Sequence, residues 1–187
     1  MPSAQEYMLN SPVIAAAKDL RSLRAALESD CQVVFLLFGT VLNIDELVQE
    51  VQDREKACFV HLDLVEGLSS REIAVDALIK FCHPDGIIST RPGHIRRAQQ
   101  LGLLAIQRAF LLDSMSMESL YSQVQLCRPD YIEILPGIIP SVLKEIAQET
   151  KIPLIAGGLI RSKQDVISAI RAGAVAVSTT CQDVWAM

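Results

Sequence analysis

Short apolar segments recur along the whole chain, and an amphipathic segment separates each one from the next. Several of the apolar segments are rich in Val, Ile, Leu and Phe on both faces, as parallel strands are when helices cover the sheet. The predicted strands cover residues 12–17, 33–39, 57–64, 85–90, 103–112, 131–137, 153–160 and 174–180. Eight strands that alternate with helices predict an α/β fold closed as a small (β/α)8 barrel of the TIM type.

The segments between the strands carry apolar residues at helical spacing. Asp19 is suited to cap one of these helices, and the sequence Ser-Ser-Arg-Glu at residues 69–72 predicts a capping box for another. The last helix has room for only about six residues, from Gln182, so a partner subunit could cover that part of the barrel wall. The predicted helices before it cover residues 19–29, 43–55, 69–81, 93–101, 114–127, 138–150 and 163–172.

The length of 187 residues predicts one domain over residues 1–187, in which residues 1–11 form an N-terminal segment that can be flexible. An open doubly wound sheet is the alternative fold. It is disfavoured because the glycine fingerprint of a dinucleotide site is missing after the first strand.

Composition narrows the classes of function. No apolar run approaches the roughly 20 residues of a membrane span, and the first ten residues lack the pattern of a secretory signal. Five scattered cysteines without a CxxC pair indicate a reducing, cytoplasmic environment and no metal site. A net charge of −5 argues against a generic nucleic-acid binder but leaves room for a local basic patch.

The last third of the chain carries the pattern of a phosphate site. Gly157 and Gly158 end one predicted strand, and Ser178 and Thr179 end the next. Glycines permit close approach of the backbone to an anion, and the last two loops of such barrels frequently hold phosphate. The alternative for the glycines is close packing of a strand against a helix.

Polar side chains also end three earlier strands, where a barrel has its working face. His61, Asp63, Gln107 and Glu133 are therefore candidate ligands for the hydroxyl groups of a small polyol. Structural alternatives stay open: a hydrogen bond between His61 and Asp63, and a buried ion pair of Arg108 with Glu133 or Asp63.

The expected parts of an active site are sparse. No lysine lies on a predicted strand to form a Schiff base, and no carboxylate cluster offers a metal site, so we assign no catalytic residue. The imbalance between ligand-holding and catalytic groups favours a sensor.

The segments that carry this pattern resemble the glycerol-3-phosphate-responsive antiterminators, the glycerol uptake operon antiterminator regulatory proteins of Gram-positive bacteria. The resemblance covers about residues 12–185, and its blocks are FVHLDLVEGLS, DGIISTR, AIQRAFLLDS, YIEILPGIIPS, IPLIAGGLIR and AGAVAVSTT.

The resemblance implies a cytoplasmic barrel without a cofactor, which binds sn-glycerol 3-phosphate and then acts on the leader mRNA of glycerol-utilisation genes. Gly157, Gly158, Ser178 and Thr179 would take the phosphate. Arg91, Arg96 and Arg97 form a local basic cluster and are the candidate RNA contacts. A homo-oligomer is a further expectation.

Two other classes of function stay open. One is a barrel enzyme, such as an isomerase, aldolase or synthase, that acts on a small phosphorylated substrate with Glu133 or Asp63 as the base. The other is a scaffold whose barrel only mediates assembly.

Overall fold

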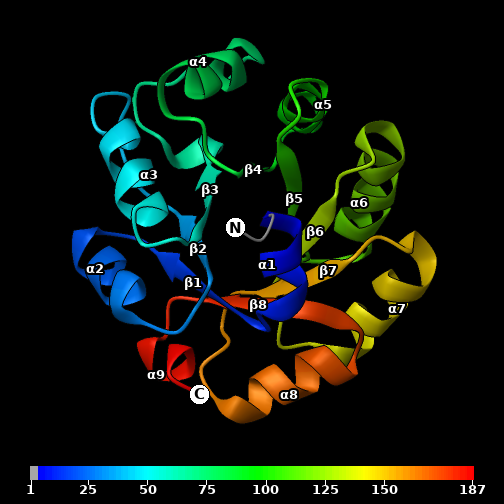
Figure 1. The fold of residues 1–187 in the computed structure, drawn as a ribbon. Coiled ribbons are helices and arrows are strands. Elements are labelled where there is room, and N and C mark those ends of the chain that lie inside the picture. Colours follow the sequence, from blue (N-terminus) through cyan, green and yellow to red (C-terminus); the bar gives the residue numbers. More distant parts are fainter. Residues whose placement is uncertain (1–3) are drawn as a thin grey trace.

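The computed structural model describes residues 4–187, and its centre is a closed barrel of parallel strands in the order β1 to β8 (Figure 1). The predicted fold class is confirmed, and each predicted strand has its counterpart. The strands are β1 (Val13–Ala17), β2 (Val33–Leu36), β3 (Ala57–His61), β4 (Gly86–Ser89), β5 (Leu104–Phe110), β6 (Tyr131–Leu135), β7 (Leu154–Gly157) and β8 (Ala174–Thr179).

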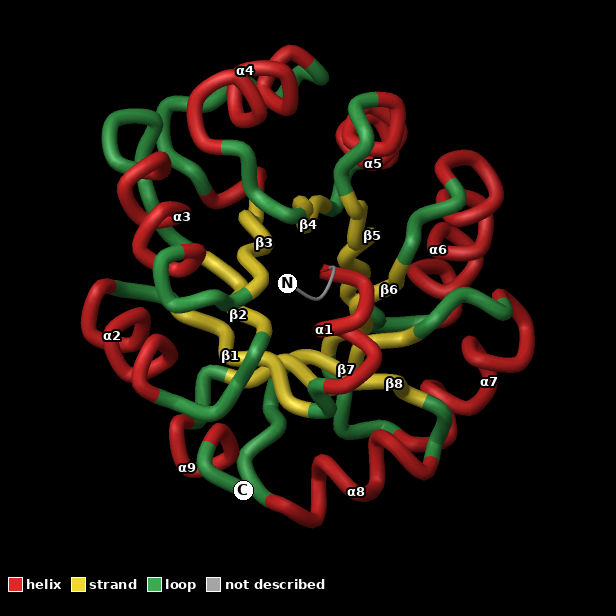
Figure 2. Tube along the Cα trace, in the orientation of Figure 1, coloured by secondary structure: helices red, strands yellow, loops and turns green. Residues whose placement is uncertain are grey.

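Helices surround this barrel as an outer layer (Figure 2). Asp19 caps the first helix of the layer and accepts a hydrogen bond from the Ser22 amide at 2.7 Å, as its position predicts. The helices of the layer are α2 (Leu20–Glu28), α3 (Ile44–Gln52), α4 (Ile73–Cys82), α5 (Pro92–Gln100), α6 (Ser114–Cys127), α7 (Pro140–Thr150), α8 (Lys163–Arg171) and α9 (Gln182–Trp185).

In the connection between β3 and α4, two local predictions are wrong. The strand predicted over residues 57–64 ends at His61, because Leu62–Leu64 form a 3-10 turn. The capping box predicted at residues 69–72 does not form: α4 begins at Ile73 after Glu72, which makes no side-chain capping bond. The Ser69 hydroxyl instead accepts a hydrogen bond from the Arg71 amide, within a turn that precedes the helix.

Strand register determines which polar side chains become neighbours. Arg108 of β5 is paired with Glu133 of β6, and Gly157 of β7 is paired with Ser178 of β8. Alternate residues of a strand face the barrel interior. Apart from the polar residues, these inward positions carry apolar side chains such as Ile14, Phe35 and Phe59. The polar groups therefore occur in one layer at the C-terminal ends of the strands.

The opposite end of the barrel is closed by the N-terminal helix α1 (Ala4–Asn10), which lies across the barrel in Figure 1. Its Met8 is fully buried with the inward-facing residues of the strands. Residues 1–3 of the N-terminal segment predicted over residues 1–11 lie outside the described residues, whereas residues 4–10 are this helix.

The one-turn helix α9 belongs to the outer layer, where it packs against β1 and α2. Val184 and Trp185 are buried, and the Trp185 indole donates a hydrogen bond to the Thr179 carbonyl oxygen at 2.8 Å. The helix is short, but its buried indole holds it against the end of β8.

We expect Trp185→Phe to lower the free energy of unfolding by about 1–3 kcal/mol, because the buried Thr179 carbonyl loses its donor. Urea unfolding followed by circular dichroism measures this change. Leu126→Ala is the control, because this exposed residue of α6 should change stability by no more than about 0.5 kcal/mol. Equal midpoints for wild type and Trp185→Phe would contradict this account of α9.

Candidate functional site

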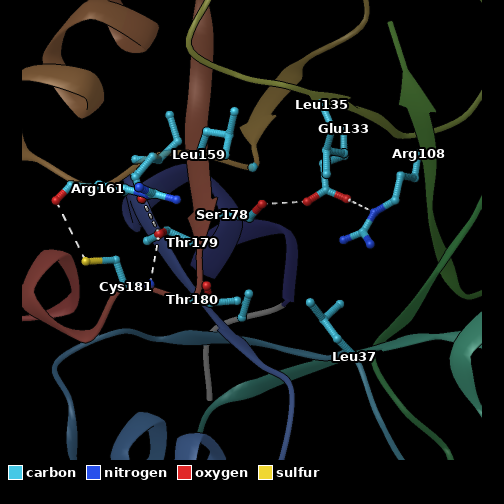
Figure 3. A pocket seen from close by; sticks show the side chains of 13 residues that line it. Leu37, Arg108, Glu133, Leu135, Leu159, Arg161, Ser178, Thr179, Thr180 and Cys181 are labelled. Carbon is cyan, nitrogen blue, oxygen red and sulfur yellow. Dashed lines mark hydrogen bonds and ion pairs between the residues drawn. The ribbon is translucent and has the colours of Figure 1, made fainter. Parts of the chain in front are cut away.

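A cavity of about 360 Å³ opens at the end of the barrel where the strands finish (Figure 3). Arg108 of β5 and Glu133 of β6 form one side of it, and the loops that follow β7 and β8 form the other. Ligand pockets commonly have volumes of about 300–1,000 Å³, so this space suits a small molecule.

Three side chains at this cavity form a continuous set of hydrogen bonds, which we call the polar cluster: Arg108, Glu133 and Ser178. Arg108 Nε donates to Glu133 Oε2 at 2.5 Å, and Ser178 Oγ donates to Glu133 Oε1 at 2.5 Å (Figure 3). Glu133 is fully buried, so its charge depends on these two donors. The ion pair left open by the sequence is thus confirmed for Arg108 with Glu133.

Gly157 makes room for the polar cluster. A Cβ atom at this position would lie 2.8 Å from both Glu133 Oε1 and Ser178 Oγ, closer than side chains tolerate. The glycine therefore permits the hydrogen bond between β6 and β8 across β7, and it is not itself part of the cavity lining.

The loops after β7 and β8 are fastened to each other by Thr179. Its hydroxyl donates to the Ile160 carbonyl oxygen at 2.6 Å and accepts from the Cys181 amide at 3.0 Å. Carbonyl and carboxylate oxygens only accept hydrogen bonds, so the hydroxyl protons of Thr179 and of Ser178 are both committed within the protein.

The loop after β7 has an unusual backbone. Gly158 lies at φ +72° and Leu159, a residue with a side chain, at φ +61°. Left-handed conformations of residues other than glycine carry a cost and tend to occur at functional sites. Both residues line the cavity, and Gly158 presents only backbone to it.

Arg161, in the same loop, is the charged side chain of the cavity wall that has no counterion. Among residues 4–187 no carboxylate lies within ion-pair distance of it, whereas Arg108 is paired with Glu133. The rim of the cavity therefore carries an unbalanced positive charge.

Asp63 does not line this cavity, because it organises the loop between β4 and α5. Its carboxylate accepts from the Thr90 amide at 2.7 Å and from the Ser89 hydroxyl at 3.1 Å. Burial opposes ionisation, but hydrogen bonds from His94 and Thr90 outweigh it, so the pKa of Asp63 lies below its usual value. The hydrogen bond between His61 and Asp63 considered from the sequence does not form among the described residues.

Gln107 faces the helices and not the barrel interior. Its amide donates to the Thr90 carbonyl oxygen at 3.0 Å and to Gln123 of α6 at 3.2 Å. Consecutive residues of a strand point to opposite faces, so Arg108 enters the barrel and Gln107 lies beneath α6. Of the four predicted polyol ligands, Glu133 is the one that lines the cavity.

His61 points into the barrel and is almost fully buried, and its Nδ1 has no hydrogen-bond partner among the described residues. Burial lowers the pKa of His61 to about 4, and the nearby charge of Arg108 adds to this effect. The ring is therefore neutral at pH 7.

The predicted RNA contacts extend along α5, from Arg91 at its N-cap to Arg97 in its last turn, and each is close to a carboxylate. Arg91 Nε lies 3.3 Å from Asp63, and Arg96 Nη2 lies 3.9 Å from Glu72. Arg97 forms two hydrogen bonds with Asp76 of α4. The positive charge of these arginines is therefore partly balanced.

Sequence inspection did not select Arg108 as a ligand contact, although it lines the cavity. Thr180 and Arg161, which the sequence placed beside the predicted phosphate site, line the cavity as well. The sequence suggested Arg108 only as a partner of Glu133 or Asp63 in an ion pair. Whether Arg161 and Thr180 reach the cavity depends on how the loops after β7 and β8 fold. In residues 4–187 no group of three His, Cys, Asp or Glu side chains could hold a metal ion, and no helix could span a membrane.

We expect stability to fall as the pH is lowered from about 6.5 towards 4, by up to about 1.4 kcal/mol per pH unit from His61 alone. In this window the unfolded state binds a proton on His61 and the folded state does not, so acid favours unfolding. Urea unfolding at several pH values measures the slope.

Replacement of His61 with Leu should remove this contribution and leave a shallower slope. His83→Asn, at an exposed histidine, is the control and should keep the slope of the wild type. Identical slopes for wild type and His61→Leu would show that His61 titrates normally.

Comparison with known proteins finds relatives that cover most of the chain. The chain is 41% identical over 177 residues to the protein YgcP of Escherichia coli K12, covering 95% of this chain and 93% of that protein. A crystal structure of the glycerol uptake operon antiterminator regulatory protein of Listeria monocytogenes matches with 39% identity and a TM-score of 0.92, covering 94% and 95% of the two chains.

An antiterminator-related protein of Thermotoga maritima matches with 31% identity and a TM-score of 0.84, covering 95% and 99% of the chains. The model of the glycerol-3-phosphate responsive antiterminators matches residues 13–185. The chain therefore belongs to the glycerol-3-phosphate responsive antiterminator family.

Proposed function

We propose that this protein is a cytoplasmic antiterminator that binds sn-glycerol 3-phosphate in the barrel cavity and, in that state, binds the leader mRNA of glycerol-utilisation genes. Membership of the family supports the regulatory role. The cavity at the ends of β7 and β8 supports the effector, because its size, its charge and its backbone suit a small phosphorylated polyol.

The phosphate group fits best between the loops after β7 and β8. Gly158 presents backbone there, and the exposed Thr180 hydroxyl and the Arg161 guanidinium belong to the same wall. A phosphate dianion accepts hydrogen bonds and needs positive charge, and within residues 4–187 the Arg161 guanidinium is not paired with a carboxylate that would compete for it. We assign Thr179 the role of holding the two loops together, because its hydroxyl proton is already committed.

Effector binding and RNA binding would be linked through the equilibrium between two states of the protein. If glycerol 3-phosphate raises the affinity for RNA by some factor, RNA must raise the affinity for glycerol 3-phosphate by the same factor. The candidate RNA surface, at Arg91, Arg96 and Arg97, follows β4, which is another of the strands that end at the working face. Because the positive charge of this surface is partly balanced, RNA binding would be weak without the effector and stronger with it.

The first test measures binding of the leader RNA by gel shift with and without sn-glycerol 3-phosphate. We expect the effector to strengthen RNA binding by about 5-fold to 150-fold, the usual range of coupling between sites. Calorimetric titration of the effector should give the same factor when RNA is added first. Absence of RNA binding in both conditions would overturn the proposal, and conversion of the effector to another compound would favour an enzyme.

The second test concerns Arg161. We expect Arg161→Gln to weaken binding of glycerol 3-phosphate by about 10-fold or more, since a hydrogen bond to a charged group contributes about 1.5–3 kcal/mol. Arg171→Gln, at the exposed end of α8, is the matched control and should leave the affinity unchanged. Equal losses in the two variants would mean that Arg161 acts only through overall charge.

The third test concerns the RNA surface. Replacement of Arg91, Arg96 and Arg97 with Gln should reduce the slope of log affinity against log salt by about 2, because each phosphate contact to single-stranded RNA contributes about 0.7. The same change at the exposed Arg21 and Arg24 of α2 is the control. An unchanged slope would place the RNA on another surface.

A further inference from the structure

The polar cluster has more hydrogen-bonding capacity than the protein uses. Arg108 has five N–H groups, and among residues 4–187 only Nε–H has a partner, Glu133. Arg108 is nevertheless 7% exposed and lies at the inner end of the cavity. Its terminal nitrogens project away from Glu133 in Figure 3, into the space that the cavity occupies.

The acceptors of the polar cluster complement these donors. The Ser178 proton is committed to Glu133, so what Ser178 offers to the cavity is the lone pairs of its oxygen. Each Glu133 oxygen accepts one hydrogen bond in the structure and has capacity for another. The inner wall of the cavity therefore presents donors from Arg108 beside acceptors from Ser178 and Glu133.

This arrangement does not suit a phosphate group. A phosphate dianion only accepts hydrogen bonds, so it would place its oxygens against the lone pairs of Ser178 and against the carboxylate of Glu133. An apolar group would leave the donors and acceptors without partners, which costs free energy in a buried site. A hydroxyl group fits because it can accept from Arg108 and donate to Ser178 or Glu133 at the same time.

We infer that Arg108, Glu133 and Ser178 form an alcohol-binding subsite that recognises the hydroxyl groups of the effector, apart from the loops that hold its phosphate. Ser178 therefore belongs to the polyol end of the site and not to the phosphate end. The inference rests on the proposed function, because it presupposes a phosphorylated ligand in the same cavity.

The test compares sn-glycerol 3-phosphate with n-propyl phosphate, which has the same carbon skeleton and no free alcohol. Calorimetry gives the dissociation constant of each ligand for the full chain. We expect glycerol 3-phosphate to bind more tightly than propyl phosphate by a factor of about 100 or more, since sites built for a hydroxyl strongly reject ligands that lack it.

Ser178→Ala separates the two possible roles of this residue. We expect it to weaken binding of glycerol 3-phosphate by about 10-fold, the contribution of one hydrogen bond from a ligand hydroxyl to Ser178, and to leave binding of propyl phosphate unchanged. Arg161→Gln is the matched comparison and should weaken both ligands by the same factor. Equal weakening of both ligands by Ser178→Ala would assign Ser178 to the phosphate and overturn the inference.

A second variant guards against misfolding of Ser178→Ala, which leaves Glu133 Oε1 without its donor. The double variant Arg108→Met, Glu133→Leu removes both charges at once. Proteins often tolerate the replacement of a buried ion pair by apolar residues of similar volume. This double variant should bind the two ligands within about 10-fold of each other, because it has lost the groups that a hydroxyl needs.

The outcomes separate the inference from the proposed function. Wild-type protein that binds both ligands equally would overturn the alcohol-binding subsite and leave the phosphate site in place. Wild-type protein that binds neither ligand would overturn the proposed effector and the inference with it. Discrimination that persists in the double variant would place alcohol recognition elsewhere in the cavity.

Discussion

The buried carboxylate of Glu133 sets the conditions for the rest of the site. It is fully buried, so it requires donors from both sides, and the register of the barrel provides Arg108 on β5 and Ser178 on β8. Ser178 is separated from Glu133 by β7, and the two can meet only because Gly157 has no side chain. One charge thus couples four strands at the end of the barrel where the cavity opens.

This coupling gives the two ends of the cavity different chemistry. The loops after β7 and β8 are fastened by Thr179 and carry an unbalanced arginine at the rim, which suits an anion. The inner wall has a paired arginine and a paired carboxylate, whose charges balance, and it offers donors and acceptors together. A ligand with a phosphate at one end and hydroxyl groups at the other matches both.

The barrel was predictable because it depends on repetition: apolar strands and amphipathic helices alternate, and each local pattern agrees with the global fold. The involvement of the loops after β7 and β8 was also predictable, because Gly157 and Thr179 end these two strands, and both loops line the cavity. That they hold a phosphate stays a prediction. The alternation of side chains along a strand also predicted that Arg108 and Gln107 face opposite ways. It did not say which side chain enters the barrel interior, because the answer depends on where β5 begins relative to β6.

Other features depend on side chains that the sequence does not order in space. Asp63 looked like a partner of His61 because alternation places residues 61 and 63 on one face, but the 3-10 turn at Leu62–Leu64 breaks that alternation and turns Asp63 towards Thr90. Ser178 looked like a phosphate ligand because its hydroxyl can donate. In the fold its proton is donated to Glu133, a commitment that the residue type alone does not reveal. Hydrogen-bond direction, and not residue identity, decides the role of such a hydroxyl.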